Sequence, residues 1–154
     1  MTRILMVCLG NICRSPLAEG IMRKNIDAAG LNAMVDSSGT AHFHIGQSPD
    51  PRSIESGQKH GIDITSLRGR QFGVEDYDKF DLIYVMDNSN YKNVLSLARG
   101  EDDKAKVELL LNVSNPDQFL DVPDPYFGGE QGFENVYQMI NEACAKIAEN
   151  LKNE

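Results

Sequence analysis

A cysteine and an arginine near the N-terminus have the spacing of an oxyanion-binding loop. Cys8 follows the apolar run 4–7, and Arg14 comes six positions later, next to a predicted helix start at Ser15 and Pro16. The five intervening residues must fold back tightly, so that backbone N–H groups and the helix N-terminus point at one anion. These donors and the guanidinium group would also stabilise a thiolate at the base of the loop. The pattern therefore predicts a nucleophilic thiol facing a phosphoryl group.

The elements that must position this loop alternate along the chain. We expect strands at 4–7, 33–36, 80–86 and 107–111, helices at 15–30, 50–59, 88–99 and 133–151, and a long loop over 113–132. This alternation is typical of an α/β fold. We expect a single three-layer domain over residues 1–154, with a four-stranded parallel sheet, helices on both faces and the phosphate-binding loop after the first strand. Ligands of such sheets bind at the carboxyl ends of strands, where Cys8 is predicted to lie.

Composition limits the classes of partner. A net charge of −8 disfavours binding to nucleic acid and insertion into an anionic membrane, because both favour a basic surface. Local donors can still bind an anion, since salt screens distant charges beyond about 8 Å. Three cysteines, an odd number, and the lack of an apolar stretch long enough for a signal peptide predict reduced thiols and a cytoplasmic location.

Residues 8–16, Cys-Leu-Gly-Asn-Ile-Cys-Arg-Ser-Pro, resemble the signature of the low-molecular-weight protein tyrosine phosphatases. The spacing of cysteine and arginine alone is a weak pattern, but the intervening residues and the distant Asp124-Pro125-Tyr126 make it specific. The resemblance implies hydrolysis of phosphotyrosine in a protein or peptide, with inorganic phosphate as product. It also implies a phosphocysteine intermediate and no metal or other cofactor.

The resemblance assigns roles to individual residues. Cys8 would attack phosphorus, Arg14 would clamp the phosphoryl group, and Asp124 would protonate the leaving phenolate and then activate water. An acid is useful here because a phenol has a pKa near 10 and leaves poorly as its anion. Further expected substrate contacts come from the loop and from an aromatic rim: Leu9, Gly10, Asn11, Ile12, Cys13, Ser15, Phe43 and Tyr126. Ser37 and Asp87 are expected to support the loop, Asp87 also as a helix cap.

Three positions carry open or unusual expectations. Leu67 stands where family members often have a histidine that supports the loop, so support around Asn11 is expected to differ. Cys13 is either a core thiol or, as the resemblance implies, a partner in a reversible disulfide with Cys8. Cys144 lies on the apolar stripe of the last predicted helix and is expected in the core.

Three other functions compete with phosphotyrosine hydrolysis. An arsenate reductase would share the loop and fold, but it needs a cysteine relay that Cys13 and Cys144 do not resemble. A protein arginine phosphatase tends to have threonine at the position of Ile12, whose bulk favours an aryl substrate. A non-catalytic phosphate-binding module would not need both Cys8 and Asp124. His42 and His44 lack metal-ligand spacing and are expected at the surface.

Overall fold

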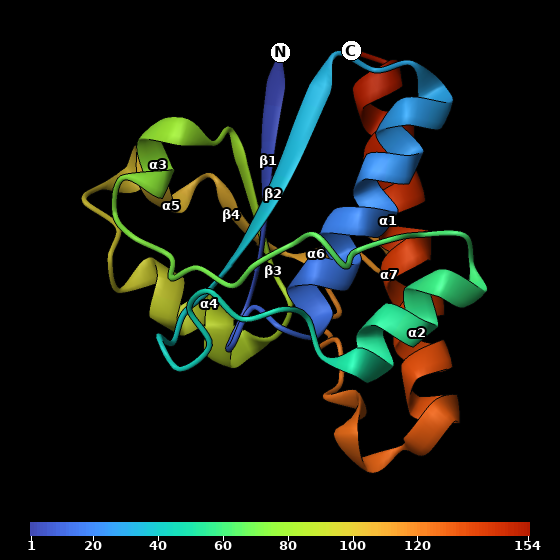
Figure 1. Cartoon of the computed structure of the whole chain (residues 1–154). Coiled ribbons are helices and arrows are strands. Elements are labelled where there is room, and N and C mark those ends of the chain that lie inside the picture. The colour runs from blue at the N-terminus through green and yellow to red at the C-terminus, as the bar shows by residue number, and fades with distance from the viewer.

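The apolar run near the N-terminus forms a central strand of a parallel sheet. In the computed structural model of the chain, which describes residues 1–154 apart from the side chain of Phe127, β1 (Thr2–Cys8) lies between β2 (Ala33–Gly39) and β3 (Leu82–Val85). The short strand β4 (Val107–Leu109) completes the order β2-β1-β3-β4, with all neighbouring pairs parallel (Figure 1). The predicted four-stranded parallel sheet is confirmed.

The strand β1 is buried on both of its faces. Ile4 and Met6 belong to a hydrophobic cluster with α1 (Arg14–Ala29) and α7 (Gly129–Lys152), whereas Leu5 and Val7 belong to a second cluster on the opposite face. Side chains alternate across a strand, so a strand covered on both sides needs apolar residues at every position. This explains the continuous apolar run in the sequence.

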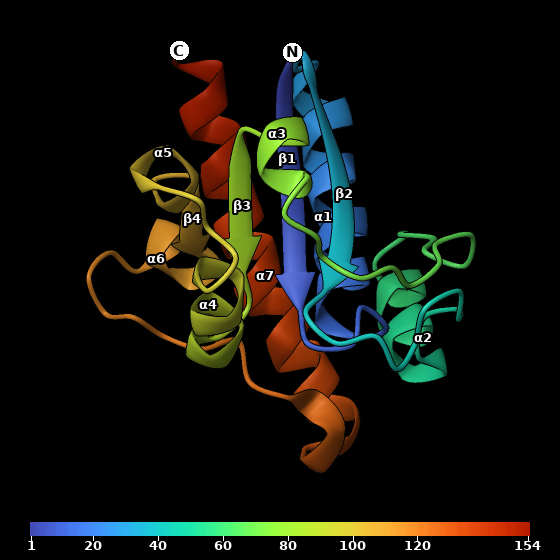
Figure 2. The ribbon, with the colours of Figure 1, turned by 90° about the vertical axis from the view of Figure 1, so that its left-hand side faces the viewer.

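Helices form a layer on each side of the sheet, as the fold class predicts. On one side, α1 packs against α7. In the same layer, α2 (Pro51–Lys59) packs against both of these helices and α6 (Leu110–Ser114) packs against α7. On the other side lie α3 (Asp76–Lys79), α4 (Asn88–Leu95) and α5 (Glu101–Lys104) (Figure 2). No helix among the described residues is long and apolar enough to span a membrane.

Several boundaries differ from the sequence prediction. The predicted strand 107–111 ends at Leu109, because Leu110 and Leu111 turn into α6 and pack into the cluster formed with α1 and α7. A short apolar run fits a strand or a buried helix equally well, so periodicity could not separate them. The predicted helix 88–99 ends at Leu95 as α4, and α7 begins at Gly129, inside the predicted loop. The short helices α3 and α5 were not predicted.

Candidate active site

The loop between β1 and α1 starts at the carboxyl end of the central strand. Asn11 adopts a left-handed backbone conformation, with φ of 57°, which asparagine tolerates better than most residues. The two residues that follow β2 hold the other side of the loop, since Thr40 N donates to Cys8 O at 2.9 Å and Ala41 N donates to Leu9 O at 2.9 Å. The loop is therefore fixed between two parallel strands.

The thiol of Cys8 lies at the base of this loop. Only 3% of Cys8 is exposed, and its Sγ accepts a hydrogen bond from Asn11 N at 3.3 Å. Ser15 Oγ lies 3.0 Å from the same sulfur, within hydrogen-bond distance. The sequence predicted Ser15 as a helix cap, but α1 begins at Arg14 and Cys13 occupies the cap position. The Ser15 hydroxyl is instead directed to the loop.

Asn11 connects the loop to residues outside it. Its Nδ2 donates to Ser15 Oγ at 2.8 Å and to Ser37 Oγ at 3.0 Å, and its Oδ1 accepts from Arg70 N at 3.0 Å. The structure therefore brings Ser37 to the loop. The backbone of Arg70 also contributes to this support, which sequence reasoning missed. A backbone donor leaves no signal in the residue type.

A buried carboxylate extends the same network. Ser37 Oγ donates to Glu19 Oε1 at 2.7 Å, and the guanidinium group of Arg23, four residues further along α1, pairs with Oε2. Burial raises the pKa of Glu19, against the hydrogen bonds from Ser37 and Arg23. Leu67 packs against the hydrophobic cluster on this side of the sheet. Support around Asn11 thus comes from Arg70, Ser37 and Glu19. An acid and a base four residues apart on a helix could have pointed to the pair.

Arg14 donates hydrogen bonds to a carboxylate and to a backbone carbonyl group, which fix its side chain. Its Nη1 donates to Asp87 Oδ2 at 2.8 Å and to Val122 O at 2.8 Å, and 8% of the residue is exposed. Burial lowers the pKa of Arg14, but the charges of Cys8 and Asp87 outweigh it and raise the value. Asp87 Oδ1 also accepts from Asn90 N at 2.7 Å and so caps α4. Asp87 therefore combines the capping and supporting positions predicted for it.

The segment after Val122 brings a distant carboxylate to the loop. Asp124 accepts a hydrogen bond from Tyr126 N at 3.0 Å and caps a short 3₁₀ helix, η1 (Pro125–Phe127). Asp124 and Tyr126 line a pocket of about 110 Å³ together with residues of the loop. Its lining residues are Cys8, Leu9, Gly10, Ile12, Cys13, Arg14, His44, Asp124 and Tyr126. Burial is the main cause that raises the pKa of Tyr126 to about 12.

Three of the predicted substrate contacts do not line this pocket: Asn11 and Ser15, which are hydrogen-bonded to Cys8 and to each other, and Phe43. The side chain of Phe43 is 69% exposed, whereas the neighbouring His44 does line the pocket. His44 Nδ1 is 2.9 Å from Gln47 Oε1, and His42 packs on Phe43 with ring centroids 4.9 Å apart. The turn that follows β2 therefore directs His44 inward and Phe43 outward. The sequence places His44 at the surface, because His42 and His44 lack metal-ligand spacing, and so misses its position in the pocket.

The other two thiols are buried. Cys13 Sγ accepts a hydrogen bond from Ser53 Oγ at 3.2 Å, and burial raises the pKa of this thiol to about 12. Cys144 has no exposed surface, and burial raises its pKa as well. All three cysteines are free thiols, so the disulfide between Cys13 and Cys8 stays a prediction. Within the described residues, no three His, Cys, Asp or Glu side chains are grouped as metal ligands.

Sequence and structure comparisons identify the family. Residues 3–154 match the family model for low molecular weight phosphotyrosine protein phosphatase. A protein of Synechocystis sp., provisionally named low molecular weight protein-tyrosine-phosphatase, is 44% identical over 99% of this chain and 98% of the relative. The low molecular weight phosphotyrosine protein phosphatase of Sus scrofa is 38% identical over 97% of this chain and 95% of the relative.

Solved structures agree with this assignment. A protein tyrosine phosphatase from Entamoeba histolytica, with Hepes in its active site, superposes with a TM-score of 0.92 at 37% identity over 99% of this chain and 98% of the other. Wzb from Vibrio vulnificus, in complex with benzylphosphonate, gives a TM-score of 0.85 at 30% identity over 97% and 98%. The chain belongs to the low molecular weight phosphotyrosine protein phosphatase family, whose members are phosphoric monoester hydrolases. The resemblance stated from residues 8–16 is confirmed.

Proposed function

We propose that this chain hydrolyses phosphotyrosine in proteins or peptides through a phosphocysteine intermediate. The observation that carries the proposal is the pocket that Cys8, Arg14 and Asp124 share, although Asp124 is distant in the sequence. A nucleophile, a bidentate cation and a carboxylic acid at one small site are the groups that phosphoryl transfer from an aryl ester requires.

In the first step the Cys8 thiolate attacks phosphorus, so that an S–P bond forms as the P–O bond to the phenol breaks. Asn11 N and Ser15 Oγ, which lie 3.3 Å and 3.0 Å from the sulfur, stabilise the thiolate. Arg14 binds the phosphoryl oxygens. Because its Nη1 is held by Asp87 and Val122, the guanidinium plane is already oriented before substrate binds.

Asp124 acts in both steps. Its protonated carboxyl group donates a proton to the departing phenolate, and the resulting carboxylate then removes a proton from the attacking water. In this second step an O–P bond forms, the S–P bond breaks, and inorganic phosphate leaves the regenerated Cys8 thiolate. The cycle consumes one water and needs no metal or other cofactor.

The depth and wall of the pocket favour an aryl ester. Cys8 is almost fully buried, so the phosphate must be carried on a long side chain, and Tyr126 and Ile12 offer an aromatic and an aliphatic wall. The benzylphosphonate complex of the Vibrio vulnificus relative supports binding of an aryl group beside a phosphoryl-like group. A phosphoserine side chain is shorter. The wall at Ile12 also disfavours phosphoarginine, and the fully buried Cys144 disfavours a thiol relay for arsenate reduction.

The test is turnover of p-nitrophenyl phosphate by the purified protein in the presence of a metal chelator. We expect activity in the wild-type protein and no measurable turnover in Cys8→Ser, because the serine hydroxyl is a much weaker nucleophile. A phosphotyrosine peptide should be turned over faster than a phosphoarginine peptide. Full activity of Cys8→Ser would refute the proposal.

A further inference from the structure

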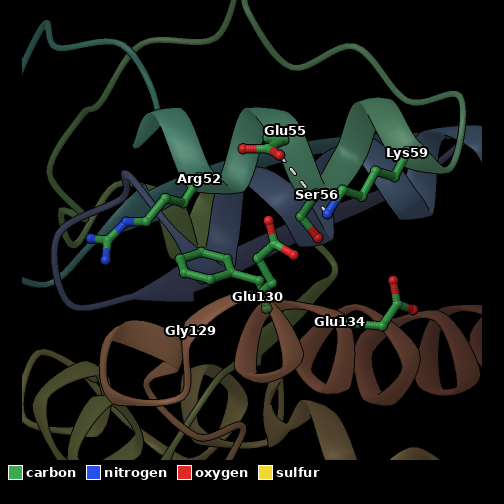
Figure 3. Close-up of a pocket in the computed structure, with 8 residues that line it drawn as sticks. Arg52, Glu55, Ser56, Lys59, Gly129, Glu130 and Glu134 are labelled. Carbon is green, nitrogen blue, oxygen red and sulfur yellow. Dashed lines mark ion pairs between the residues drawn. The ribbon is translucent and has the colours of Figure 1, made fainter.

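A second and larger cavity lies beside the site pocket. It has a volume of about 300 Å³ and lies between α2 and the beginning of α7 (Figure 3). Charged and aromatic side chains of the two helices line it, among them Arg52, Glu55, Lys59, Glu130, Phe133 and Glu134. None of these residues takes part in the proposed phosphoryl transfer.

Arg52 lines the second cavity and packs on a residue of the site pocket. Its Cζ lies 4.4 Å from the ring centroid of Tyr126, which lines the site pocket, and 5.3 Å from that of Phe133, which lines the second cavity. Nε and Nη2 of this arginine donate hydrogen bonds of 3.1 Å each to the carboxylate of Asp50, which fixes the side chain. The second cavity is therefore within reach of a peptide whose phosphotyrosine enters the site pocket.

The polar and charged groups around the cavity leave one carboxylate without a partner among the described residues. Asp50 neutralises Arg52, Lys59 pairs with Glu55 at 3.9 Å, and Glu134 is bonded to His60 at 2.8 Å. Glu130 has no hydrogen-bond or ion-pair partner in the part of the chain that the structure describes.

Glu130 is exposed and extends from α7 toward α2 (Figure 3). The buried ring of Phe133 provides apolar surface in the same cavity. A side chain with an aliphatic stem and a positively charged end is complementary to the Phe133 ring and the Glu130 carboxylate.

We propose that this cavity binds a lysine or arginine side chain of the phosphotyrosine substrate, two residues from the phosphotyrosine. This inference rests on the proposed function. In an extended peptide, side chains two residues apart point to the same side and are separated by about 7 Å. The distances of 4.4 Å and 5.3 Å from Arg52 Cζ limit the separation of the Tyr126 and Phe133 ring centroids to about 10 Å, and a spacing of about 7 Å lies within this limit. The cation pairs with Glu130 while its aliphatic stem lies against Phe133. The net charge of −8 also favours basic partners.

The experiment measures kcat/KM for phosphotyrosine peptides with Lys, norleucine or Glu placed two residues before or after the phosphotyrosine. Each value is divided by kcat/KM for p-nitrophenyl phosphate, which has no flanking residue. The variants are Glu130→Gln and Glu130→Lys. Glu142→Gln is the matched control, because Glu142 is an exposed acid of the same helix α7 and does not line the cavity.

We expect the wild-type protein and Glu142→Gln to prefer Lys over Glu by about five-fold in one of the two series, as for a partly exposed ion pair. Glu130→Gln should lose most of this preference, and Glu130→Lys should reverse it. Higher salt should reduce the wild-type preference, because it screens the pair.

Three outcomes would overturn the inference while leaving the proposed function intact. They are turnover of p-nitrophenyl phosphate without a preference for Lys in either series, an equal preference in Glu130→Gln, and a preference for Glu. Absence of p-nitrophenyl phosphate turnover in the wild-type protein would instead contradict the proposed function.

Discussion

At the scale of single residues, the thiol of Cys8 has different surroundings from those of Cys13 and Cys144. Cys8 accepts a hydrogen bond from Asn11 N and lies 3.0 Å from Ser15 Oγ, so polar groups surround its sulfur. Burial instead holds Cys13 and Cys144 as neutral thiols, since it raises the pKa of Cys13 to about 12 and also raises the pKa of Cys144. The proposed reactivity of Cys8 therefore rests on the loop around it and not on the residue type.

The proposed role of Asp124 as the acid predicts that its loss affects substrates according to their leaving groups. Replacing Asp124 with Ala removes the proposed proton donor, so esters with poor leaving groups should suffer most. We expect kcat for phenyl phosphate to fall by about 10² to 10³-fold, and kcat for p-nitrophenyl phosphate by about ten-fold or less. Steady-state kinetics on a series of aryl phosphates checks this. Equal losses across the series would show that Asp124 does not act as the acid.

At the scale of elements, the end of β2 limits the position of the loop. Gly39 lies so close to the loop that a Cβ atom there would be 2.7 Å from Leu9 O and 2.9 Å from Asn11 N. Both of these are backbone atoms, which cannot rotate away as a side chain can. The strand and the loop therefore form one rigid unit, which only a residue without a Cβ atom allows.

The variant Gly39→Ala should displace this loop. We expect kcat/KM for p-nitrophenyl phosphate to fall by about 10²-fold, because small displacements of catalytic groups have effects of this size. Gly100→Ala is the control, since a Cβ there meets no atom within 4 Å and its φ of 178° suits any residue. Wild-type activity in Gly39→Ala would mean that the loop is not held by β2.

On the opposite side of the sheet, Arg99 ties α3 to α5. It donates hydrogen bonds to Asp78 at 2.7 and 3.1 Å and to Asp103 at 2.8 and 3.1 Å, and these bonds lower the pKa of both carboxyl groups. A carboxyl group with a lowered folded-state pKa stabilises the fold above its unfolded pKa of about 3.9. This stabilisation is lost as the pH falls through the folded-state pKa.

Replacing Arg99 with Gln should therefore lower the urea midpoint at pH 7, and the difference from the wild-type protein should shrink toward pH 3. Urea titrations followed by circular dichroism at the two pH values measure this difference. Lys79→Gln is the control, because it removes one cation from α3 that has no ion-pair partner among the described residues. A difference independent of pH would contradict the role of the two carboxylates.

At the scale of the whole molecule, two hydrophobic clusters share the central strand. Ile4 and Met6 join the cluster with α1 and α7, whereas Leu5 and Val7 join the cluster on the other face. Loss of either cluster exposes one face of β1, to which the loop is attached. Unfolding should therefore be a single cooperative transition that coincides with loss of activity.

The closing helix α7 tests this coupling. Ile140 is fully buried, and we expect Ile140→Ala to reduce the free energy of unfolding by about 2 to 4 kcal/mol. Met139→Ala, at a neighbouring position that is 38% exposed, should change it by less than about 1 kcal/mol. Urea unfolding followed by circular dichroism and by residual activity measures both. Separate transitions for the two signals would show that the faces unfold independently.

The sequence alone determined those features that depend on local order. The apolar run 4–7, the helix starts and the stripe on α7 predicted the strands, the main helices and the parallel sheet, because periodicity reflects burial directly. The spacing from Cys8 to Arg14 predicted the loop, because a turn between a strand and a helix is built from neighbouring residues.

Tertiary structure decided those features that depend on contacts between distant segments. The run 107–111 splits into β4 and α6 because of where it packs, and His44 rather than Phe43 lines the pocket because of how one turn is held. Glu19, Arg70 N and Val122 O reach the loop or Arg14 from other elements. The cavity at Glu130 exists only because α2 lies against α7. Such contacts depend on three-dimensional packing, and neither residue type nor spacing along the chain encodes them directly.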